Sequence, residues 1–348
     1  MRRLRRVAAL MFVAASSWPF QTLAQTADES AWQTLHMLNG RLLVSAPGNS
    51  IDETVGADSI MAAAPAEGSI SRIRIPLADT EIVVQARELY ALFPSDPETF
   101  FRNVVLGSEQ PVGDVTPYSI DLSLPLKAYG IGKGSYRHPS GDYVLANVLI
   151  AQSDGSAQHL QIMTWEKPPE VVARAEAIAE RIVFSLRAGP RQELPRGGTH
   201  TLVKVKQSDG ELADLTLTIP KEYTFSKEQG PDFVVFRIGR LVPLDATTGS
   251  FGVYVGNFPS YHFSHKGIPL EKLRRTPTKI LGHHTEWLER FEPPLPGSPG
   301  WVHREVILRP DSLSDGLALH IFISAPEDGS ELAELTKTAE SGIQISKR

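Results

Sequence analysis

The stretch Ser153-Asp-Gly-Ser-Ala-Gln-His-Leu-Gln-Ile162 returns, 161 positions further along the chain, as Ser314-Asp-Gly-Leu-Ala-Leu-His-Ile-Phe-Ile323. In the same register the match extends to residues 185 and 346, with ten identities in 33 aligned positions, where about two are expected by chance at ordinary composition. Asp-Gly is a turn signal of β-hairpins, and apolar runs that favour strands flank each copy. The sequence therefore predicts the same supersecondary unit twice.

Each predicted hairpin leads into a predicted helix. The strands of the first hairpin span 144–150 and 160–165, and Pro168-Pro169 opens the helix where a missing N–H costs nothing. In the second copy the strands span 302–308 and 317–323, and Ser330 is a candidate N-cap. Apolar residues then recur at helical spacing: Val171, Ala175, Ile178 and Ile182 in the first copy, and Leu332, Leu335, Ala339 and Ile343 in the second. We interpret the two copies as an internal duplication, with similar local structure of independent origin as the alternative.

A linker rich in glycine, proline and arginine divides the chain, because these residues at this density interrupt helices and strands. We place it at 189–198, between one domain at 25–188 and another at 199–348. The other patterns alternate between strands and short helices, with helices expected at 87–92, 97–105 and 269–275. The expected fold class is α+β: two consecutive domains, each a mostly antiparallel sheet with packed helices, and each ending in a hairpin followed by a helix.

The N-terminus has the three parts of a secretory signal peptide. Four arginines within residues 2–6 precede an apolar run at 7–15, and Thr-Leu-Ala ends at Ala24. We expect cleavage between Ala24 and Gln25 and export to a bacterial periplasm, by the general or the twin-arginine route. An uncleaved anchor is the alternative, although the apolar run is too short to span a bilayer. No later stretch approaches 18 apolar residues, so no membrane span is expected in the mature chain.

Charge and cysteine content exclude several classes of function. Without residues 1–24 the chain carries 31 Lys and Arg against 40 Asp and Glu, a net charge of −9. This balance argues against a nucleic-acid-binding protein, which needs a basic surface. The chain contains no cysteine, so disulfides, thiolate nucleophiles and Cys-ligated metal sites are excluded.

Few motifs carry chemistry. The chain has no G-x-S-x-G and no H-E-x-x-H pattern, and the glycine-rich stretch 130–135 matches no phosphate-binding spacing. The best metal candidates are His262 and His265, spaced i, i+3, with His283 and Glu286 about 20 residues later, since imidazole and carboxylate suit zinc or nickel. We favour the interpretation of these residues as loop histidines. No catalytic residue, metal or cofactor is therefore expected.

Aromatic residues gather in a segment that is typical of a loop. Tyr254 belongs to a predicted strand, and after a turn the chain presents large rings and a histidine. Aromatic residues are enriched at protein interfaces and their hot spots, so the segment is a candidate partner-binding loop, or alternatively a cap on the domain core. The candidates are Tyr254, Phe258, Tyr261, His262 and Phe263, with Tyr136 and Arg137 as weaker ones.

The chain resembles the two-domain periplasmic immunity proteins of type VI secretion phospholipase effectors. Residues 81–90, Glu-Ile-Val-Val-Gln-Ala-Arg-Glu-Leu-Tyr, look like the strand-to-helix step of the family's N-terminal domain. Residues 252–260, Gly-Val-Tyr-Val-Gly-Asn-Phe-Pro-Ser, look like the strand and turn of its C-terminal domain. The resemblance implies a non-enzymatic protein that binds a cognate phospholipase toxin stoichiometrically, at its active-site mouth or its lid.

Two other functions remain open from the sequence. A periplasmic carrier of lipid or of a small apolar molecule would hold an internal apolar cavity. A hydrolase or metalloenzyme would bring His262, His265, His283 and Glu286 together, or a serine with a histidine and an acid.

Overall fold

The computed structural model describes residues 31–53, 70–77, 80–100, 110–111, 117–120, 127–131, 136–137, 142–165, 168–190, 193–206, 211–230, 232–295, 299–310, 317–327 and 329–347. The predicted signal peptide and its cleavage site at Ala24 and Gln25 lie outside these residues. The chain divides into two compact units, and the boundary between Glu193 and Leu194 falls inside the segment expected to be a linker. Residues 243–245 belong to the first unit, although they follow the boundary.

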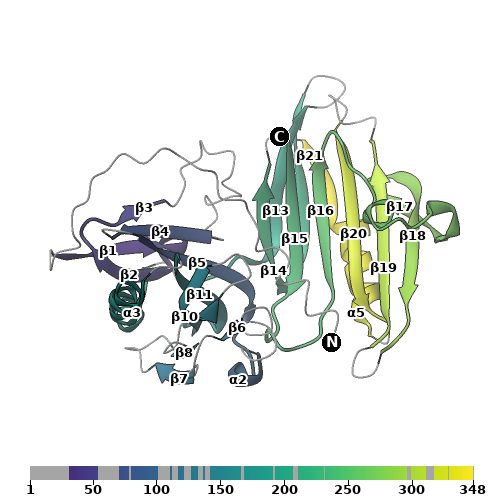
Figure 1. Cartoon of the computed structure of the whole chain (residues 1–348). Coiled ribbons are helices and arrows are strands. Elements are labelled where there is room, and N and C mark those ends of the chain that lie inside the picture. Colours follow the sequence, from purple (N-terminus) through teal and green to yellow (C-terminus); the bar gives the residue numbers. More distant parts are fainter. Residues whose placement is uncertain are drawn as a thin grey trace. The chain divides into compact units, whose positions relative to one another are not determined.

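Unit 1 contains two antiparallel sheets. One has the strand order β1-β2-β12, and the larger has the order β3-β4-β5-β11-β10-β8-β7, with β9 pairing with both β6 and β10 (Figure 1). Its strands are β1 (Trp32–Met37), β2 (Leu42–Pro47), β3 (Ile51–Asp52), β4 (Ile70–Pro76), β5 (Glu81–Leu92), β6 (Gln110–Pro111), β7 (Pro117–Ile120), β8 (Lys127–Ile131), β9 (Tyr136–Arg137), β10 (Asp142–Ala151), β11 (Ser156–Trp165) and β12 (Arg187–Ala188). Its helices are the 3-10 helix η2 (Leu38–Gly40), α2 (Pro97–Phe100) and α3 (Pro169–Phe184).

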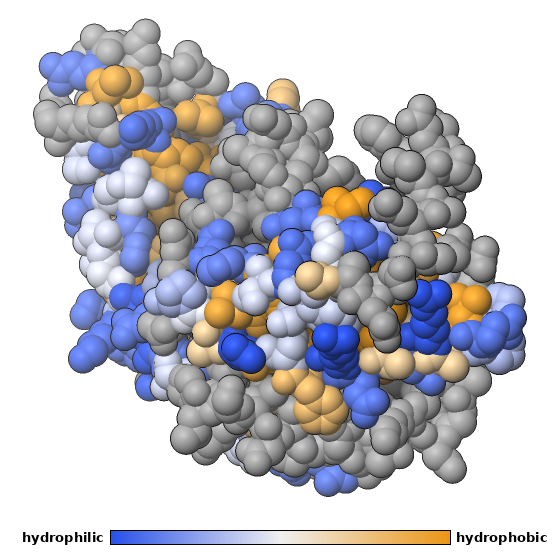
Figure 2. All heavy atoms as spheres, turned by 90° about the vertical axis from the view of Figure 1, so that its left-hand side faces the viewer, coloured by the Kyte–Doolittle hydropathy of each residue, from blue (hydrophilic) through white to orange (hydrophobic). Residues whose placement is uncertain are grey.

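The core of unit 1 lies where α3 and β2 meet the larger sheet. Alternate residues of the central strands, such as Val148 and Leu160, point into it, as the two-residue period of a strand requires. Ala175 and Ile182 of α3 complete it. On the face of unit 1 seen in Figure 2, hydrophobic side chains lie scattered among hydrophilic ones.

Unit 2 is built around one sheet with the order β13-β14-β15-β16-β20-β19-β18-β17, and β21 pairs with β14 (Figure 1). All registered pairings in it are antiparallel. Its strands are β13 (Arg196–Lys206), β14 (Leu212–Gln229), β15 (Phe233–Arg240), β16 (Ser250–Gly256), β17 (Arg274–Ile280), β18 (His283–Glu292), β19 (Trp301–Leu308), β20 (Ala318–Pro326) and β21 (Ile343–Lys347). Its helices are α4 (His262–His265), the 3-10 helix η6 (Leu270–Lys272) and α5 (Glu331–Gly342).

Helix α5 packs on one face of this sheet. Leu335 and Ala339 are buried against strand residues such as Val253 and Ile321. The carboxylate of Glu331, in the first turn, accepts hydrogen bonds from Thr248 Oγ1 and from the Gly249 N–H, both at 2.6 Å. The core of unit 2 therefore lies between α5 and the sheet, and the opposite face of the sheet is left to other residues.

Mostly antiparallel sheets with few helices are consistent with the expected α+β class. Two of the expected helices are wrong. Residues 87–92 continue β5, because Ala86 and Glu88 pair with β11 and this pairing overrides the helix propensity of Ala, Arg, Glu and Leu. Residues 269–275 contain only the short η6 before β17 begins at Arg274. The helix expected at 97–105 is present as α2, and residues 101–105 lie outside the described residues.

Candidate functional site

The segment between β16 and β17, residues 257–273, crosses the face of the unit 2 sheet that α5 leaves uncovered. Val253, Leu319 and Ile321 point toward α5, so Tyr254 and His320, one residue further along their strands, point the other way. Phe263 of this segment is buried against Leu273 and Leu288. We call residues 257–273 the crossing loop, and this small second core holds it on the sheet.

A polar cluster lies beneath the crossing loop. Glu305 Oε2 accepts hydrogen bonds from the His262 backbone N–H at 2.8 Å and lies 2.9 Å from His320 Nε2. His262 Nδ1 lies 3.5 Å from Glu305 Oε1. The side chains of Glu305 and His320 are 5% and 4% exposed, whereas that of His262 is half exposed. We call His262, Glu305 and His320 the Glu305 cluster.

Burial and hydrogen bonding act against each other in this cluster. Burial raises the pKa of Glu305, but the hydrogen bonds and charges of His262 and His320 together lower that pKa to about 2. Burial lowers the pKa of His320 more than Glu305 raises it. The cluster therefore contains an ionised carboxylate beside a neutral buried imidazole near neutral pH.

The aromatic candidates occupy different environments. Phe258 is 79% exposed. Tyr261 is half-buried, with the edge of its ring toward His320 at 5.9 Å between centroids, and burial raises its pKa. Tyr254 stacks on Phe233 at 5.5 Å. Phe263 is 2% exposed, so its prediction as a surface contact residue is wrong: the ring fills the small core instead.

The weaker partner-binding candidates Tyr136 and Arg137 form β9, whose backbone pairs with Val144 and Tyr143 of β10. They lie in unit 1, and the structure gives no contact between them and the crossing loop.

The structure brings together a different set of possible metal ligands from the one expected. Within the described residues, the group of three or more such side chains is His262, Glu305 and His320, whose donor atoms lie within 4.8 Å of one another. His265 lies instead 2.7 Å from Ser260 Oγ, and Glu286 pairs with Arg275 at 3.1 Å. His283 is the first residue of β18. Of the four candidates, only His262 belongs to the group.

Sequence reasoning missed Glu305 and His320 because they come from strands far along the chain from His262. Two signals could have found them. His320 is identical in the repeat to His159. Glu305 interrupts an otherwise apolar strand segment, Val302 to Leu308, and a charged residue that becomes buried needs a partner.

Ser260 and His265 form the serine–histidine pair closest to nucleophilic chemistry, with 2.7 Å between Oγ and Nε2. A triad also needs an acid that orients the imidazole. Among the described residues no carboxylate is hydrogen-bonded to His265, and both Ser260 and His265 are exposed. This pair therefore lacks the third member and the water-excluded setting of a hydrolase site.

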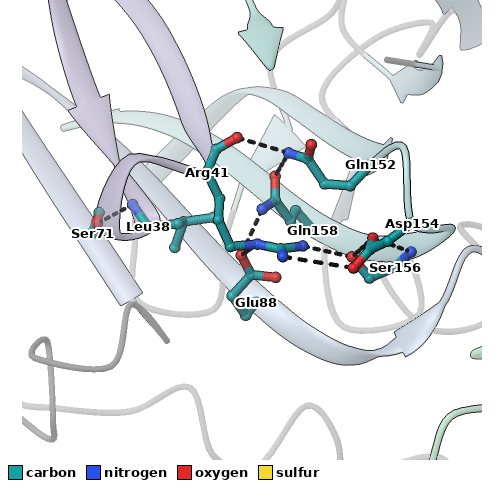
Figure 3. Close-up of polar contacts among 8 residues, drawn as sticks. All are labelled: Leu38, Arg41, Ser71, Glu88, Gln152, Asp154, Ser156 and Gln158. Carbon is teal, nitrogen blue, oxygen red and sulfur yellow. Dashed lines mark hydrogen bonds and ion pairs between the residues drawn. The ribbon is translucent and has the colours of Figure 1, made fainter. Parts of the chain in front are cut away.

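Unit 1 contains its own buried polar network, centred on Arg41 (Figure 3). The guanidinium donates to Glu88 Oε1 at 2.7 Å and to Ser156 Oγ at 2.6 Å, and it lies 3.6 Å from Asp154 Oδ2. Gln158 donates to the same Glu88 oxygen at 2.6 Å. Ser156 Oγ in turn donates to Asp154. The hydroxyl is occupied on both sides and no imidazole takes part, so the network is suited to fixing the chain and not to nucleophilic attack.

Neither family models nor curated proteins give a match to the chain. Solved structures that it resembles include the apo structure of immunity protein TplEi of the type VI secretion system (T6SS) from Pseudomonas aeruginosa, with 12% identity over 92% of this chain and 99% of that chain and a TM-score of 0.24. Another is a chain of the Tle4–Tli4 complex, with 12% identity over 90% and 97% and a TM-score of 0.22. The expected resemblance to T6SS immunity proteins is thus confirmed. TM-scores this low place none of this chain's residues on theirs.

None of the helices in the described part of the chain combines the length and the hydrophobicity that a membrane span needs.

Proposed function

We propose that this chain is an immunity protein that binds a type VI secretion phospholipase effector and neutralises it in the periplasm as a stoichiometric complex. The observation that carries the proposal is Phe258. It is 79% exposed and lies in the segment 252–260, which carries the family resemblance. A large ring in water gains nothing for the fold and gains free energy when a partner covers it.

The attachment of the crossing loop on both sides of this ring supports the proposal. Before it, β16 pairs with β15 and β20 up to Gly256. After it, the His262 N–H is bonded to Glu305, and Phe263 is buried. A contact residue on an anchored loop loses less conformational entropy on binding than one on a free loop. Phe258 is therefore suited to be a hot spot, with half-buried Tyr261 beside it.

The proposed location rests on the N-terminal sequence. We propose that residues 1–24 are removed after Ala24 and that the mature chain acts in the periplasm, where it meets phospholipases delivered by neighbouring cells.

We also infer that the two units arose by duplication, as the repeat in the sequence suggested. In both sheets an inner strand, β5 or β16, pairs with the second strand of a hairpin, β11 or β20. The first strand of that hairpin, β10 or β19, pairs with β8 or β18, and a helix follows the hairpin in each unit. After the helix, β12 returns to β2 and β21 returns to β14. The shared order supports a common origin.

Capture of the partner tests the proposed function. The mature chain, tagged and expressed in the periplasm of its native organism, is purified and its companions are identified by mass spectrometry. We expect one phospholipase in about equal amount, whose activity on phospholipid vesicles falls to zero at one equivalent of this chain. Recovery of bound lipid without a stoichiometric protein would favour a carrier instead.

The contact itself is tested with a matched pair of variants. Phe258→Ala should weaken the complex by about 2 kcal/mol, or roughly 30-fold in Kd, as for a truncated hot-spot ring. Phe184→Ala removes a ring of similar exposure, 57%, from unit 1 and should leave Kd unchanged. If a phospholipase is captured and both variants bind it as tightly as the wild type, the complex forms through another surface.

A further inference from the structure

We propose that the Glu305 cluster binds a zinc ion through His262, Glu305 and His320. Two imidazoles and a carboxylate are a donor set found in zinc sites, and they disfavour magnesium and calcium, which prefer oxygen ligands. The three donor atoms lie within 4.8 Å of one another in the part of the chain that the structure describes. Glu305 and His320 come from adjacent strands, β19 and β20, and His262 is brought to them by the crossing loop.

The spacing of the donor atoms suits a tetrahedral ion. Ligands about 2.0–2.1 Å from zinc lie about 3.3–3.4 Å from one another. His320 Nε2 lies 2.9 Å from Glu305 Oε2, and His262 Nδ1 lies 3.5 Å from Glu305 Oε1. The ring centroids of His262 and His320 are 5.0 Å apart, and two imidazoles on one tetrahedral ion have ring centres about 5 Å apart. Adjustments of a few tenths of an ångström would therefore close the site.

The protonation of the site can adapt to the ion. Zinc takes the position of the proton between His320 Nε2 and Glu305 Oε2, and the neutral imidazole then carries its proton on Nδ1. The His262 backbone N–H still donates to the carboxylate, which orients it for the ion. Because the His262 side chain is half exposed, water can reach the fourth position.

The equivalent position in unit 1 shows which parts of the cluster the fold itself requires. His159 of β11 lies opposite Leu149, and its Nε2 is 3.0 Å from Oδ1 of Asn147, two residues earlier on β10. His320 of β20 lies opposite Ile307, and its Nε2 is 2.9 Å from Glu305, two residues earlier on β19. A buried polar partner for the histidine is thus common to both units.

Unit 2 departs from this common arrangement in two ways. It has the charged Glu305 in place of the neutral Asn147, and it adds the second imidazole of His262. A neutral amide satisfies the buried histidine in unit 1, so satisfying His320 does not require a carboxylate. Both differences add a metal ligand.

Zinc titration of the full mature chain, produced without a histidine tag and freed of metal with a chelator, tests the site. Isothermal titration should give one site per chain, and cobalt(II) as a probe should develop the visible absorption of a tetrahedral ion. His262→Gln is the decisive variant, because the backbone N–H that bonds Glu305 remains and the chain should keep its circular dichroism spectrum. We expect it to weaken zinc binding at least ten-fold and to abolish the cobalt band.

His265→Gln is the matched control, since it removes an exposed imidazole from the same short helix, α4, outside the cluster. It should bind zinc like the wild type. Glu305→Gln, checked for folding in the same way, should also lose the site. Equal zinc affinity in the wild type and His262→Gln, no binding by the wild type, an equal loss in His265→Gln, or displacement of zinc by equimolar magnesium would each overturn the proposal. None of these readouts depends on a phospholipase, so the zinc site and the immunity function can fail separately.

Discussion

Phe258 and Phe263 lie five positions apart in the crossing loop and have opposite environments: the first is 79% exposed and the second 2%. Phe263→Ala should therefore lower the free energy of unfolding by about 3 kcal/mol, because the ring leaves a cavity between Leu273 and Leu288. Phe258→Ala should change it by less than about 0.5 kcal/mol. Denaturant unfolding of both variants measures this, and similar stabilities would contradict the assignment of Phe263 to a core.

The sequence could find this loop but not divide its rings. Aromatic residues in a segment without helical or strand periodicity carry no signal for which side faces the sheet. The same reason explains the missed cluster residues. His262 was recognised as a possible ligand, whereas Glu305 and His320 become its neighbours only through pairing of β19 with β20.

At the scale of elements, local signals predicted the hairpins well and the long strands less well. Asp154-Gly155 forms the turn between β10 and β11, with Gly155 at a φ of +79° that favours glycine. The C-terminal half of β5 has helix-forming residues, and only its partners β4 and β11 make it a strand. Pairing between distant segments is information that one short window of sequence does not contain.

Gly189 illustrates how an element can differ from its local signal. The sequence suggested a helix stop before Pro190, but α3 ends at Phe184 and Gly189 follows β12. Its N–H donates to the Arg41 carbonyl at 2.8 Å. A Cβ at this position would lie 2.0 Å from the Gly40 carbonyl oxygen and 2.6 Å from its carbon, both backbone atoms. The glycine is therefore required by close approach of two backbones.

Gly189→Ala should therefore destabilise unit 1 by about 2 kcal/mol or more, since rigid backbone must move apart. Gly239→Ala, in β15, is the control: a Cβ there meets nothing within 4 Å, and the change should be neutral or slightly stabilising. Thermal unfolding of the two variants compares them. An equal and small effect of both would mean that β12 adjusts freely beside η2.

At the scale of the whole molecule, the pH dependence of stability depends on buried groups with opposite effects. Burial raises the pKa of Glu88 to about 7, although Arg41 and Gln158 lower it. Between its unfolded pKa, about 4.5, and 7, folded Glu88 holds a proton that the unfolded chain releases, so stability falls as pH rises. Burial and Arg87 lower the pKa of His159 to about 3. Between 3 and its unfolded pKa, about 6.5, only the unfolded chain binds that proton, so stability rises with pH.

From about pH 4.5 to 6.5 the two effects in unit 1 should nearly cancel, each having a slope of up to about 1.4 kcal/mol per pH unit. The pKa of Glu305 in unit 2 is lowered to about 2, so its contribution is complete above pH 4.5 and adds no slope here. His159→Gln should therefore make unit 1 more stable at pH 5 than at pH 6, by about 1.4 kcal/mol relative to the wild type. Glu88→Gln should do the reverse. Urea unfolding of the three proteins at both pH values measures the slopes, and three parallel profiles would mean that neither group changes its proton occupancy on folding.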